Sequence, residues 1–353
     1  MAMMAAIRLA LVLGIAIAGT GCTALQGPPV EYPAIAPSDG PGEEVVTEHA
    51  FLFEGATERL AVSVDDRLLE GARSAGREVL VRGEVPEKEW IAGAYRAQVA
   101  DPAQDRFYAD LLAGFREIRE RRGLDPDRYL ELLAGAVQQL PYVAAPRTAA
   151  KYPAETWSDR GGDCDDKALL LAGLLGREGY RVALLVFLPE AHMAVGVGCP
   201  DGMGWSGTDY AYLEATNATY VGSLPERIGD GDRLDSQPLV VPVGNGTTLY
   251  GAVADVRAIE AARETARARI ETLGPEIDRR AGAHEGERER LEAPGSSGSR
   301  AAYDAALARY RAEGAAIDRL VDEHNRLVDL LNLTAASRYD RAGAADYLRA
   351  NPP

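Results

Sequence analysis

Residues 168–175 (Ala-Leu-Leu-Leu-Ala-Gly-Leu-Leu) contain no polar side chain, so the segment has no face suited to water. As a helix it has to be buried on all sides, which requires further layers of structure around it. Gly179 predicts where this helix ends. Runs of β-forming residues follow at 182–188, 193–197, 210–216 and 239–243. We therefore predict an α+β fold in which a central helix packs on an antiparallel sheet.

The chain ahead of this helix predicts a β-hairpin and several helices. The hairpin has strands at 51–53 and 60–64, on either side of Gly55-Ala56-Thr57. Apolar residues at helical spacing predict a helix that starts near Trp90, a second over 107–118 and a third that begins at Asp125-Pro126 and ends before Pro141.

The last third of the chain has a long helical pattern. Apolar residues recur every three or four positions over 253–277 and again over 303–331, and a Gly/Ser run at 294–299 separates the two stretches. This pattern predicts an antiparallel helical hairpin, a coiled coil with its turn in that run. Each arm has about 35 residues, or on the order of 50 Å of helix. We expect Gly274-Pro275 to kink the first arm and His324 to pack on the seam.

The N-terminus has the layout of a secretory signal. Arg8 precedes an apolar run over 9–18 that is too short to span a membrane comfortably. Gly19-Thr20-Gly21 ahead of Cys22 resembles a lipoprotein cleavage site, at which Cys22 becomes the lipidated first residue of the mature chain. Plain secretion and an uncleaved anchor are the alternatives. Residues 22–49 continue with Pro, Gly and acidic residues and no apolar period, which predicts a flexible tether.

Composition limits the partners and cofactors. With 54 acidic against 38 basic residues the net charge is -16, so the chain would repel a polyanion and we expect no nucleic-acid partner. Three Cys and four His are too few for a disulfide scaffold or a His-rich metal site, and we expect no metal or cofactor. The location that the N-terminus implies is the outer face of the cell membrane, with a lipid anchor.

The chemistry is expected in the run Gly161-Gly162-Asp163-Cys164-Asp165-Asp166-Lys167. The glycines allow a tight turn, and Asp163 is a candidate N-cap for the apolar helix. That position puts Cys164 in the first helical turn, where the macrodipole favours a thiolate, the nucleophilic form of cysteine. The three aspartates act in the opposite direction, so an imidazolium nearby has to tip the balance.

His192 and Glu214 are the candidate partners of that thiol. His192 stands at the head of a predicted strand and could act as base, and Glu214, on the next strand, could orient its ring. A charged residue in an apolar strand requires a partner. The spacing of Cys164 and His192 alone is also compatible with a buried, inert thiol.

Several motifs in order give the chain a resemblance to the transglutaminase-like superfamily, in its prokaryotic or archaeal exported lipoprotein branch. They are Gln138-Gln139-Leu140-Pro141-Tyr142, Tyr152-Pro153-Ala154-Glu155-Thr156, Gly162-Asp163-Cys164-Asp165-Asp166-Lys167, Gly179-Tyr180-Arg181-Val182, His192-Met193-Ala194-Val195-Gly196-Val197 and Tyr212-Leu213-Glu214-Ala215-Thr216. The similarity covers about 51–243 and leaves out the helical hairpin.

The resemblance implies a papain-like core and acyl transfer through a thioester. It implies that Cys164 is the nucleophile, His192 the base and acid, and Glu214 the orienting acid, where many members have Asp. Asp209 is the alternative third residue, and Gln138 is either an oxyanion donor or an ordinary helix residue. The substrate would be a peptide, isopeptide or glutamine amide bond, with hydrolysis expected rather than cross-linking.

These inferences give five segments: a signal peptide (1–21), the lipidated Cys22 with its tether (22–49), a transglutaminase-like domain (50–250), a helical hairpin (251–335) and a C-terminal tail (336–353). Two metal interpretations are rejected. Cys164, His192 and Cys199 have no common zinc spacing, and the aspartates at 163, 165 and 166 lack the alternation of a calcium loop. The competing function is a catalytically silent scaffold or binding lipoprotein whose hairpin recruits a protein partner.

Overall fold

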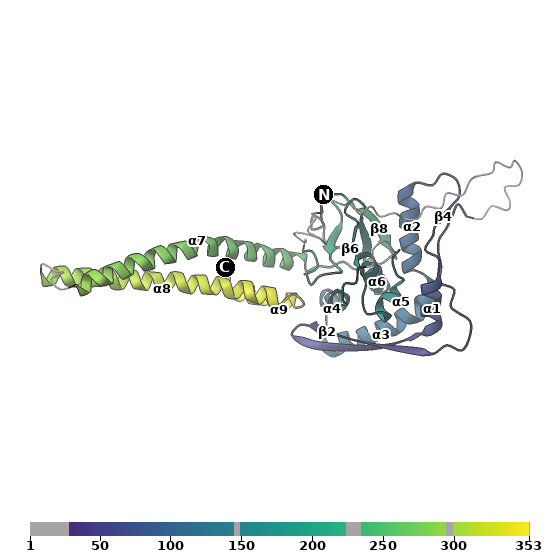
Figure 1. The fold of residues 1–353 in the computed structure, drawn as a ribbon, viewed down its shortest axis with the longest axis horizontal. Helices are drawn as coiled ribbons and strands as arrows, with labels where there is room; N and C mark the ends of the chain where they lie inside the picture. The colour runs from purple at the N-terminus through teal and green to yellow at the C-terminus, as the bar shows by residue number, and fades with distance from the viewer. Residues whose placement is uncertain (1–27, 145–148, 224–233, 294–298, 353) are drawn as a thin grey trace, which may run out of the picture. The chain divides into compact units, whose positions relative to one another are not determined.

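The computed structural model of the protein describes residues 28–144, 149–223, 234–293 and 299–352. Over these residues the fold is a mixture of helices and antiparallel strands (Figure 1). The chain divides into two compact units after Val256, and each is described by itself below.

The main sheet of the first unit has four strands, which are antiparallel, as the sequence predicts. Their order is β7-β6-β5-β8. Two smaller antiparallel pairs, β2 with β3 and β1 with β4, precede it in the chain. The strands are β1 (Val30–Glu31), β2 (Glu44–Phe53), β3 (Ala56–Asp65), β4 (Leu80–Val81), β5 (Val182–Phe187), β6 (His192–Gly198), β7 (Tyr210–Leu213) and β8 (Leu239–Val243).

Helices precede the main sheet and follow it. A 3-10 turn over Pro102–Gln104 leads into the third of them. The helices are α1 (Asp66–Ser74), α2 (Glu87–Val99), α3 (Asp105–Arg122), α4 (Pro126–Gln138), α5 (Pro153–Ser158), α6 (Cys164–Arg177), α7 (Val253–Glu292), α8 (Arg300–Ala336) and α9 (Arg341–Ala350).

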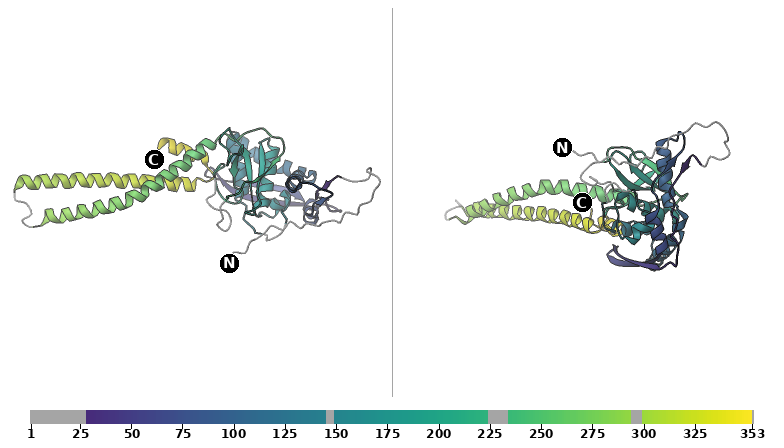
Figure 2. Two further views of the ribbon diagram at one scale, coloured as in Figure 1. Left: turned by 90° about the horizontal axis from the view of Figure 1, so that it is seen from above. Right: turned by 45° about the vertical axis from the view of Figure 1, so that its right-hand side comes forward.

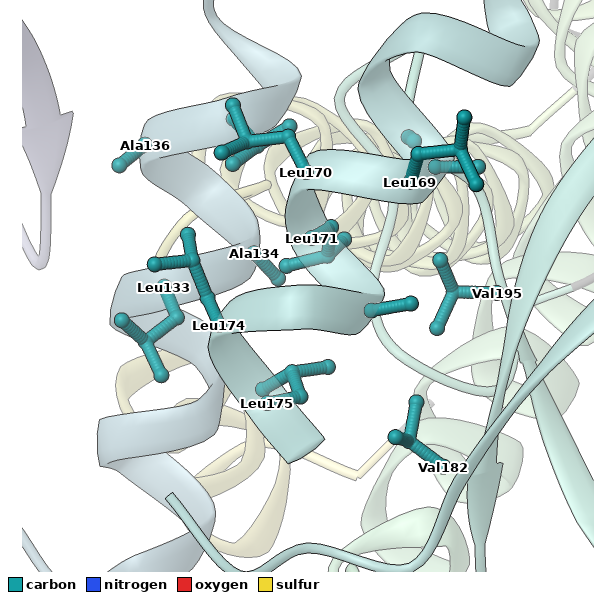
Figure 3. Close-up of a cluster of buried hydrophobic side chains, with 14 of the residues drawn as sticks. Leu133, Ala134, Ala136, Leu169, Leu170, Leu171, Leu174, Leu175, Val182 and Val195 are labelled. Carbon is teal, nitrogen blue, oxygen red and sulfur yellow. The ribbon is translucent and has the colours of Figure 1, made fainter. Parts of the chain in front are cut away.

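Helix α6 lies at the centre of the first unit, as its apolar sequence requires. Its leucines contact α4 on one side and the main sheet on the other (Figure 3). The chain turns away at Gly179, whose φ of +81° is a conformation that favours glycine. The helix therefore anchors the first unit, with its N-terminal residue held at the edge of the core. The labelled side chains are Leu169, Leu170, Leu171, Leu174 and Leu175 from α6, Leu133, Ala134 and Ala136 from α4, and Val182 and Val195 from the strands.

The predicted β-hairpin is confirmed, and its strands are longer than predicted. β2 and β3 pair from Glu44 opposite Asp65 to Phe53 opposite Ala56. Alternate residues point into the core, which β3 joins by packing against α3 and β2 by packing against α4. The two-residue connection at Glu54 and Gly55 has positive φ at both positions, the geometry of a tight hairpin turn.

The prediction of a flexible tether is wrong for residues 28–49. β1 pairs with β4, and β2 begins at Glu44. Ile35 is buried, and its N–H donates to the Asp101 carboxylate at 2.7 Å. The segment is fixed by backbone pairing and by this one apolar anchor, which a search for apolar periodicity does not detect. The predicted signal peptide (1–21), Cys22 and the first tether residues lie outside the described residues.

The second unit contains two long helices and a short third one. Arg269 of α7 pairs with Glu323 of α8, and Arg280 pairs with Glu313, so the two helices run antiparallel (Figure 2). Their seam holds a small cluster of Ala266, Leu273, Leu327 and Leu330, against which residues of α9 pack. Helix α7 continues through Pro275. Most of the predicted Gly/Ser turn, at 294–298, lies outside the described residues, and the predicted tail (336–353) includes α9.

Candidate active site

Cys164 is the first residue of α6 and follows the turn at Gly161 and Gly162. Asp163 is the N-cap: its carboxylate accepts a hydrogen bond from the Asp166 N–H at 3.5 Å, and the Asp166 carboxylate accepts one from the Asp163 N–H at 3.2 Å. The predicted cap and the place of Cys164 in the first turn are both confirmed. N–H groups of a first turn have no intrahelical acceptor, so the thiol lies at the positive end of the helix dipole.

Asp166 holds the turn ahead of Cys164 in place. A Cβ on Gly162 would lie 2.5 Å from the Asp166 Cβ, which explains the glycine at that position. The same carboxylate accepts a hydrogen bond from the Lys151 N–H at 2.6 Å. Burial, together with the charge of Asp163, raises the pKa of Asp166 to about 6. Asp166 therefore ties the chain at residue 151 to the start of the helix.

The aspartates around Cys164 lie close together, which costs electrostatic energy. The carboxylates of Asp163, Asp165 and Asp166 have oxygens within 4.8 Å of one another. Burial, with the hydrogen bond and charge of Asp163, raises the pKa of Asp165 well above its ordinary value. Asp165 also accepts a hydrogen bond from the Asp166 N–H at 2.9 Å. These contacts belong to the helix start, in line with the capping role expected for the cluster.

The surroundings of Cys164 disfavour its thiolate. Burial raises the pKa of the thiol to about 12, and the charges of Asp165 and Asp163 add to the rise, as does that of Glu214. The backbone N–H of Met193 acts in the opposite direction. The thiol is therefore protonated at neutral pH in this structure. The helix dipole lowers the pKa of the thiol, whereas burial and the carboxylates raise it, and the net shift is upward.

His192 and Glu214, which lie on neighbouring segments, are brought together. The His192 Nε2 is 3.2 Å from the Glu214 Oε2 and 3.1 Å from the Tyr212 hydroxyl. That hydroxyl donates to the same Glu214 oxygen at 2.7 Å. The other carboxylate oxygen accepts the Thr216 N–H at 2.8 Å and the Thr216 hydroxyl at 2.5 Å. Glu214 thus contacts the histidine ring, although it lies one residue beyond β7 and not within the strand.

The Glu214 carboxylate is built to stay ionised while buried. Only 2% of its side chain is exposed. Burial alone would raise its pKa, but hydrogen bonds from His192 and Thr216 outweigh that effect and bring the pKa to about 2. A buried carboxylate that keeps its charge at neutral pH can hold an imidazole N–H in a fixed direction.

Cys164 and His192 are neighbours without a direct bond. The N–H of Met193 lies close enough to influence the thiol, which places the sulfur next to the start of β6. Met193 and Val195 face α6, however, and strand alternation puts His192 on the other face, where its ring is 6.2 Å from that of Phe187. Both residues lie within the described part, and no hydrogen bond joins the sulfur to either ring nitrogen.

Gln138 and Lys167 donate hydrogen bonds to backbone carbonyls around the site. The Gln138 side-chain amide donates to the carbonyls of Glu214 at 2.8 Å and Thr219 at 3.1 Å, so both of its hydrogens are used. This arrangement leaves none for the oxyanion role that the resemblance suggested. The fully buried Lys167 ammonium donates to the carbonyls of Gln138 and Leu140 at 3.2 and 2.9 Å. Burial lowers its pKa to about 8, although the charge of Glu214 opposes the shift.

The other candidates lie elsewhere. The Asp209 side chain is 75% exposed and pairs with Arg181 at 3.1 Å, so the alternative third residue is not at the histidine. Cys199 is buried, and among the described residues neither it nor Cys164 forms a disulfide. Cys22 lies outside the described residues. Among those that the structure does describe, none of the helices is both long and apolar enough to cross a membrane.

Tyr212 and Thr216 both contact Glu214, and neither is among the site residues predicted from the sequence. Both stand two positions from Glu214 in the sequence. That spacing was the available signal. Compared with known proteins, the chain matches no protein-family model, no curated protein and no solved structure.

Proposed function

We propose that the protein is a cysteine-dependent acyl-transfer enzyme of the transglutaminase-like kind, acting on amide bonds of peptides or proteins. In this proposal Cys22 carries a lipid that holds the enzyme at the outer face of the cell membrane. The observation that carries the proposal is the buried His192–Glu214 pair at the head of β6, where the N–H of the following residue, Met193, lies beside the thiol of Cys164 at the helix start. A histidine oriented by an ionised acid beside a helix-start thiol is the arrangement that activates a sulfur nucleophile.

The raised pKa of Cys164 determines how that activation works. Because the resting thiol keeps its proton, His192 acts as a general base during the attack and not as the partner of a preformed thiolate. Its unbonded Nδ1 takes the Sγ proton while Sγ bonds to the carbonyl carbon. The imidazolium then protonates the leaving nitrogen as the C–N bond breaks, which leaves a thioester on Cys164. Water or an amine attacks that thioester and releases the thiol.

The sulfur and ring have to approach one another for this transfer. Hydrogen bonds between catalytic groups are commonly long in ligand-free enzymes and tighten when substrate binds. The helix-start N–H of Cys164 is the oxyanion donor in this scheme, because the Gln138 amide is already used. Water is the expected acceptor, so hydrolysis is proposed over cross-linking.

A silent scaffold is the second candidate, and one observation favours it. The structure has a protonated thiol and no Cys164–His192 hydrogen bond, which is what an inactive relative of such an enzyme would retain. In that case the long α7–α8 hairpin would carry the function by recruiting a protein partner.

Acyl-enzyme formation separates the two candidates. We would incubate the full chain with p-nitrophenyl acetate, follow nitrophenolate release, and search for an acetyl group on the Cys164 peptide by mass spectrometry. The enzyme proposal predicts an adduct that hydroxylamine removes, as a thioester requires. It also predicts a rate that falls about 100- to 10,000-fold in His192→Ala.

Cys199→Ala is the matched control, because it removes the other cysteine of the described residues that forms no disulfide, and it does not touch the site. It should leave the adduct and the rate unchanged, whereas Cys164→Ala should abolish both. If the Cys164 peptide of the folded protein carries no acetyl group, or if its acetylation is independent of His192, the enzyme proposal is wrong and the scaffold is retained.

A further inference from the structure

The hydroxyl of Tyr212 is buried in an otherwise apolar cluster. The Tyr212 ring lies among Leu185, Phe187 and Ala194, with the Trp205 ring at 6.3 Å. A phenylalanine would fill this space equally well, and a buried hydroxyl without a hydrogen bond costs free energy. The oxygen is instead placed between two functional groups, the His192 Nε2 at 3.1 Å and the Glu214 Oε2 at 2.7 Å. The position of the hydroxyl therefore calls for an explanation beyond packing.

The hydrogen bonds fix which nitrogen of His192 carries the proton. Tyr212 has a single hydroxyl hydrogen, and at 2.7 Å it is directed at the ionised Glu214 carboxylate. The tyrosine oxygen then faces the ring with a lone pair only. Glu214 Oε2, at 3.2 Å from the same ring nitrogen, is also an acceptor. With two acceptors in front of it, Nε2 must carry a hydrogen, so in the neutral form of the ring Nδ1 is the unprotonated nitrogen that can act as base.

We propose that Tyr212 is a positioning residue, whose hydroxyl bridges His192 and Glu214 and thereby keeps the Nε2–H form of the imidazole in the orientation that leaves Nδ1 free to accept a proton. The proposal names the base atom for the acyl transfer proposed above, and its role in turnover rests on that function. The proton position itself is a property of the resting protein.

The Thr216 contacts complete the argument. They hold Glu214 Oε1 through both the backbone N–H and the hydroxyl, so the carboxylate cannot turn to offer its second oxygen to the ring. Without the Tyr212 hydroxyl, Oε2 would be the sole acceptor at Nε2, at the longer of the two distances. The ring is then held by this one longer contact, so a turn about χ2 that exchanges its two nitrogens costs less free energy.

Nitrogen NMR of the full chain labelled with 15N-histidine tests the proposal. The chain has four histidines, and His192→Gln assigns the relevant signals. In the wild type we expect His192 as the Nε2–H tautomer. In Tyr212→Phe we expect a second population with the proton on Nδ1. We also expect acyl transfer to Cys164 about tenfold slower, with an unchanged KM, because a misplaced base lowers kcat.

Tyr210→Phe is the matched control, since it removes a hydroxyl two residues earlier on β7 that does not reach His192. It should change neither the tautomer nor the rate. A wild-type ring with its proton on Nδ1, or a Tyr212→Phe spectrum identical to the wild type, would overturn the proposal. If Tyr212→Phe does not fold, the wild-type tautomer decides, together with Thr216→Val, which removes one of the two hydrogen bonds to Glu214 Oε1 and should also produce a second population with the proton on Nδ1. Loss of the acyl-enzyme result alone would refute the proposed function and leave the tautomer result standing.

Discussion

The two compact units differ in how deeply selected ionisable side chains are buried. In the first, Glu214, Lys167 and Asp166 are buried, and each is held by backbone groups or a neighbouring side chain. In the second, the Arg–Glu pairs that join α7 and α8 keep between 23% and 42% of each side chain exposed. These three groups of the first unit are therefore fixed at defined atoms away from water, whereas the pairs that join α7 and α8 stay in contact with solvent.

The difference shows which unit is built for chemistry. Removing one partner of a buried charge leaves the other without water, which costs about 3 to 5 kcal/mol. An exposed pair that loses a partner is solvated, and the cost is about 0 to 1 kcal/mol. In the first unit burial itself shifts the pKa values of Cys164 and Lys167, and buried partners lower that of Glu214, whereas the exposed hairpin pairs serve to align two helices.

A core deletion should break the first unit and leave the second nearly intact. Leu171→Ala removes a side chain that is fully buried in α6, and we expect it to lower the free energy of unfolding by about 2 to 5 kcal/mol. All three tryptophans, Trp90, Trp157 and Trp205, belong to the first unit, so their fluorescence in a urea titration reports on it alone.

The matched substitution in the hairpin is Leu320→Ala, on the partly buried seam of α8. It should leave the tryptophan transition in place. It should lower the free energy of unfolding of the hairpin, measured by far-ultraviolet circular dichroism, by about 1 kcal/mol or less. Equal costs for the two substitutions would contradict the claim that burial distinguishes the units.

The buried ammonium of Lys167 should make the first unit more stable in mild alkali. Its folded pKa of about 8 lies below its ordinary value of 10.5, so above pH 8 the unfolded chain binds a proton that the folded chain lacks. The contribution of Lys167 to the free energy of unfolding therefore rises with pH, by about 1 to 3 kcal/mol between pH 8 and 10, and below pH 8 the full penalty of burying the charge remains. The raised pKa of Cys164 acts in the opposite direction over this range, so the Lys167 contribution is obtained as the difference between wild type and Lys167→Met.

Lys167→Met should remove this rise, and Lys88→Met, at an exposed position of α2, should retain it. The readout is the urea midpoint of tryptophan fluorescence at pH 7, 8, 9 and 10. An identical pH profile in wild type and Lys167→Met would show that the lysine is solvated. It would contradict the claim that Lys167 is buried while the hairpin charges are exposed.

Local sequence was sufficient for α6 and its start. The N-cap Asp163, Cys164 and the apolar residues of the helix lie in one continuous stretch of chain. The local sequence pattern was therefore enough to predict the cap, the position of Cys164 and the buried helix. The pairing of His192 with Glu214 depends on the register of β6 and β7, and it was proposed from strand order and family resemblance instead. The Tyr212 bridge needs the actual side-chain directions, which no pattern in the sequence supplies.

The first half of β2 was missed because its pattern is inverted. The buried positions are occupied by the polar Thr47 and His49, while Val45 and Val46 are exposed. A search for apolar alternation therefore reads this strand as a loop. The burial of Lys167 was not predicted, for a different reason. Its acceptors are carbonyls at and just after the end of α4, which are remote from it in the sequence.

The buried histidine of β2 should weaken the first unit in acid. The His49 Nε2 contacts the Ala136 carbonyl at 3.0 Å, and burial lowers its pKa. Below about pH 6.5 the unfolded chain gains a proton that the folded ring resists, so the contribution of His49 to the free energy of unfolding falls, on the order of 1 kcal/mol by pH 5. The raised pKa values of Asp165 and Asp166 act in the opposite direction, so the His49 contribution is obtained as the difference between wild type and His49→Gln. His49→Gln should flatten this part of the tryptophan profile. His284→Gln, which alters a similar ring-to-carbonyl contact to Tyr310 in the hairpin, should not.

The smallest effect is expected at the hairpin pair Arg269–Glu323, which has 42% and 31% of its side chains exposed. Its geometry is good, with Arg269 Nε at 2.7 Å and Nη2 at 3.2 Å from the two carboxylate oxygens. Even so, water competes for both groups, so a double-mutant cycle with Arg269→Ala and Glu323→Ala should give a coupling of about 0.2 to 1 kcal/mol. Raising the salt from 0.1 to 1 M should reduce it, because exposed charges are screened. A coupling above about 2 kcal/mol that persists in salt would mean that the pair is shielded from solvent, so that the hairpin, like the first unit, holds its charges in a fixed and dry environment.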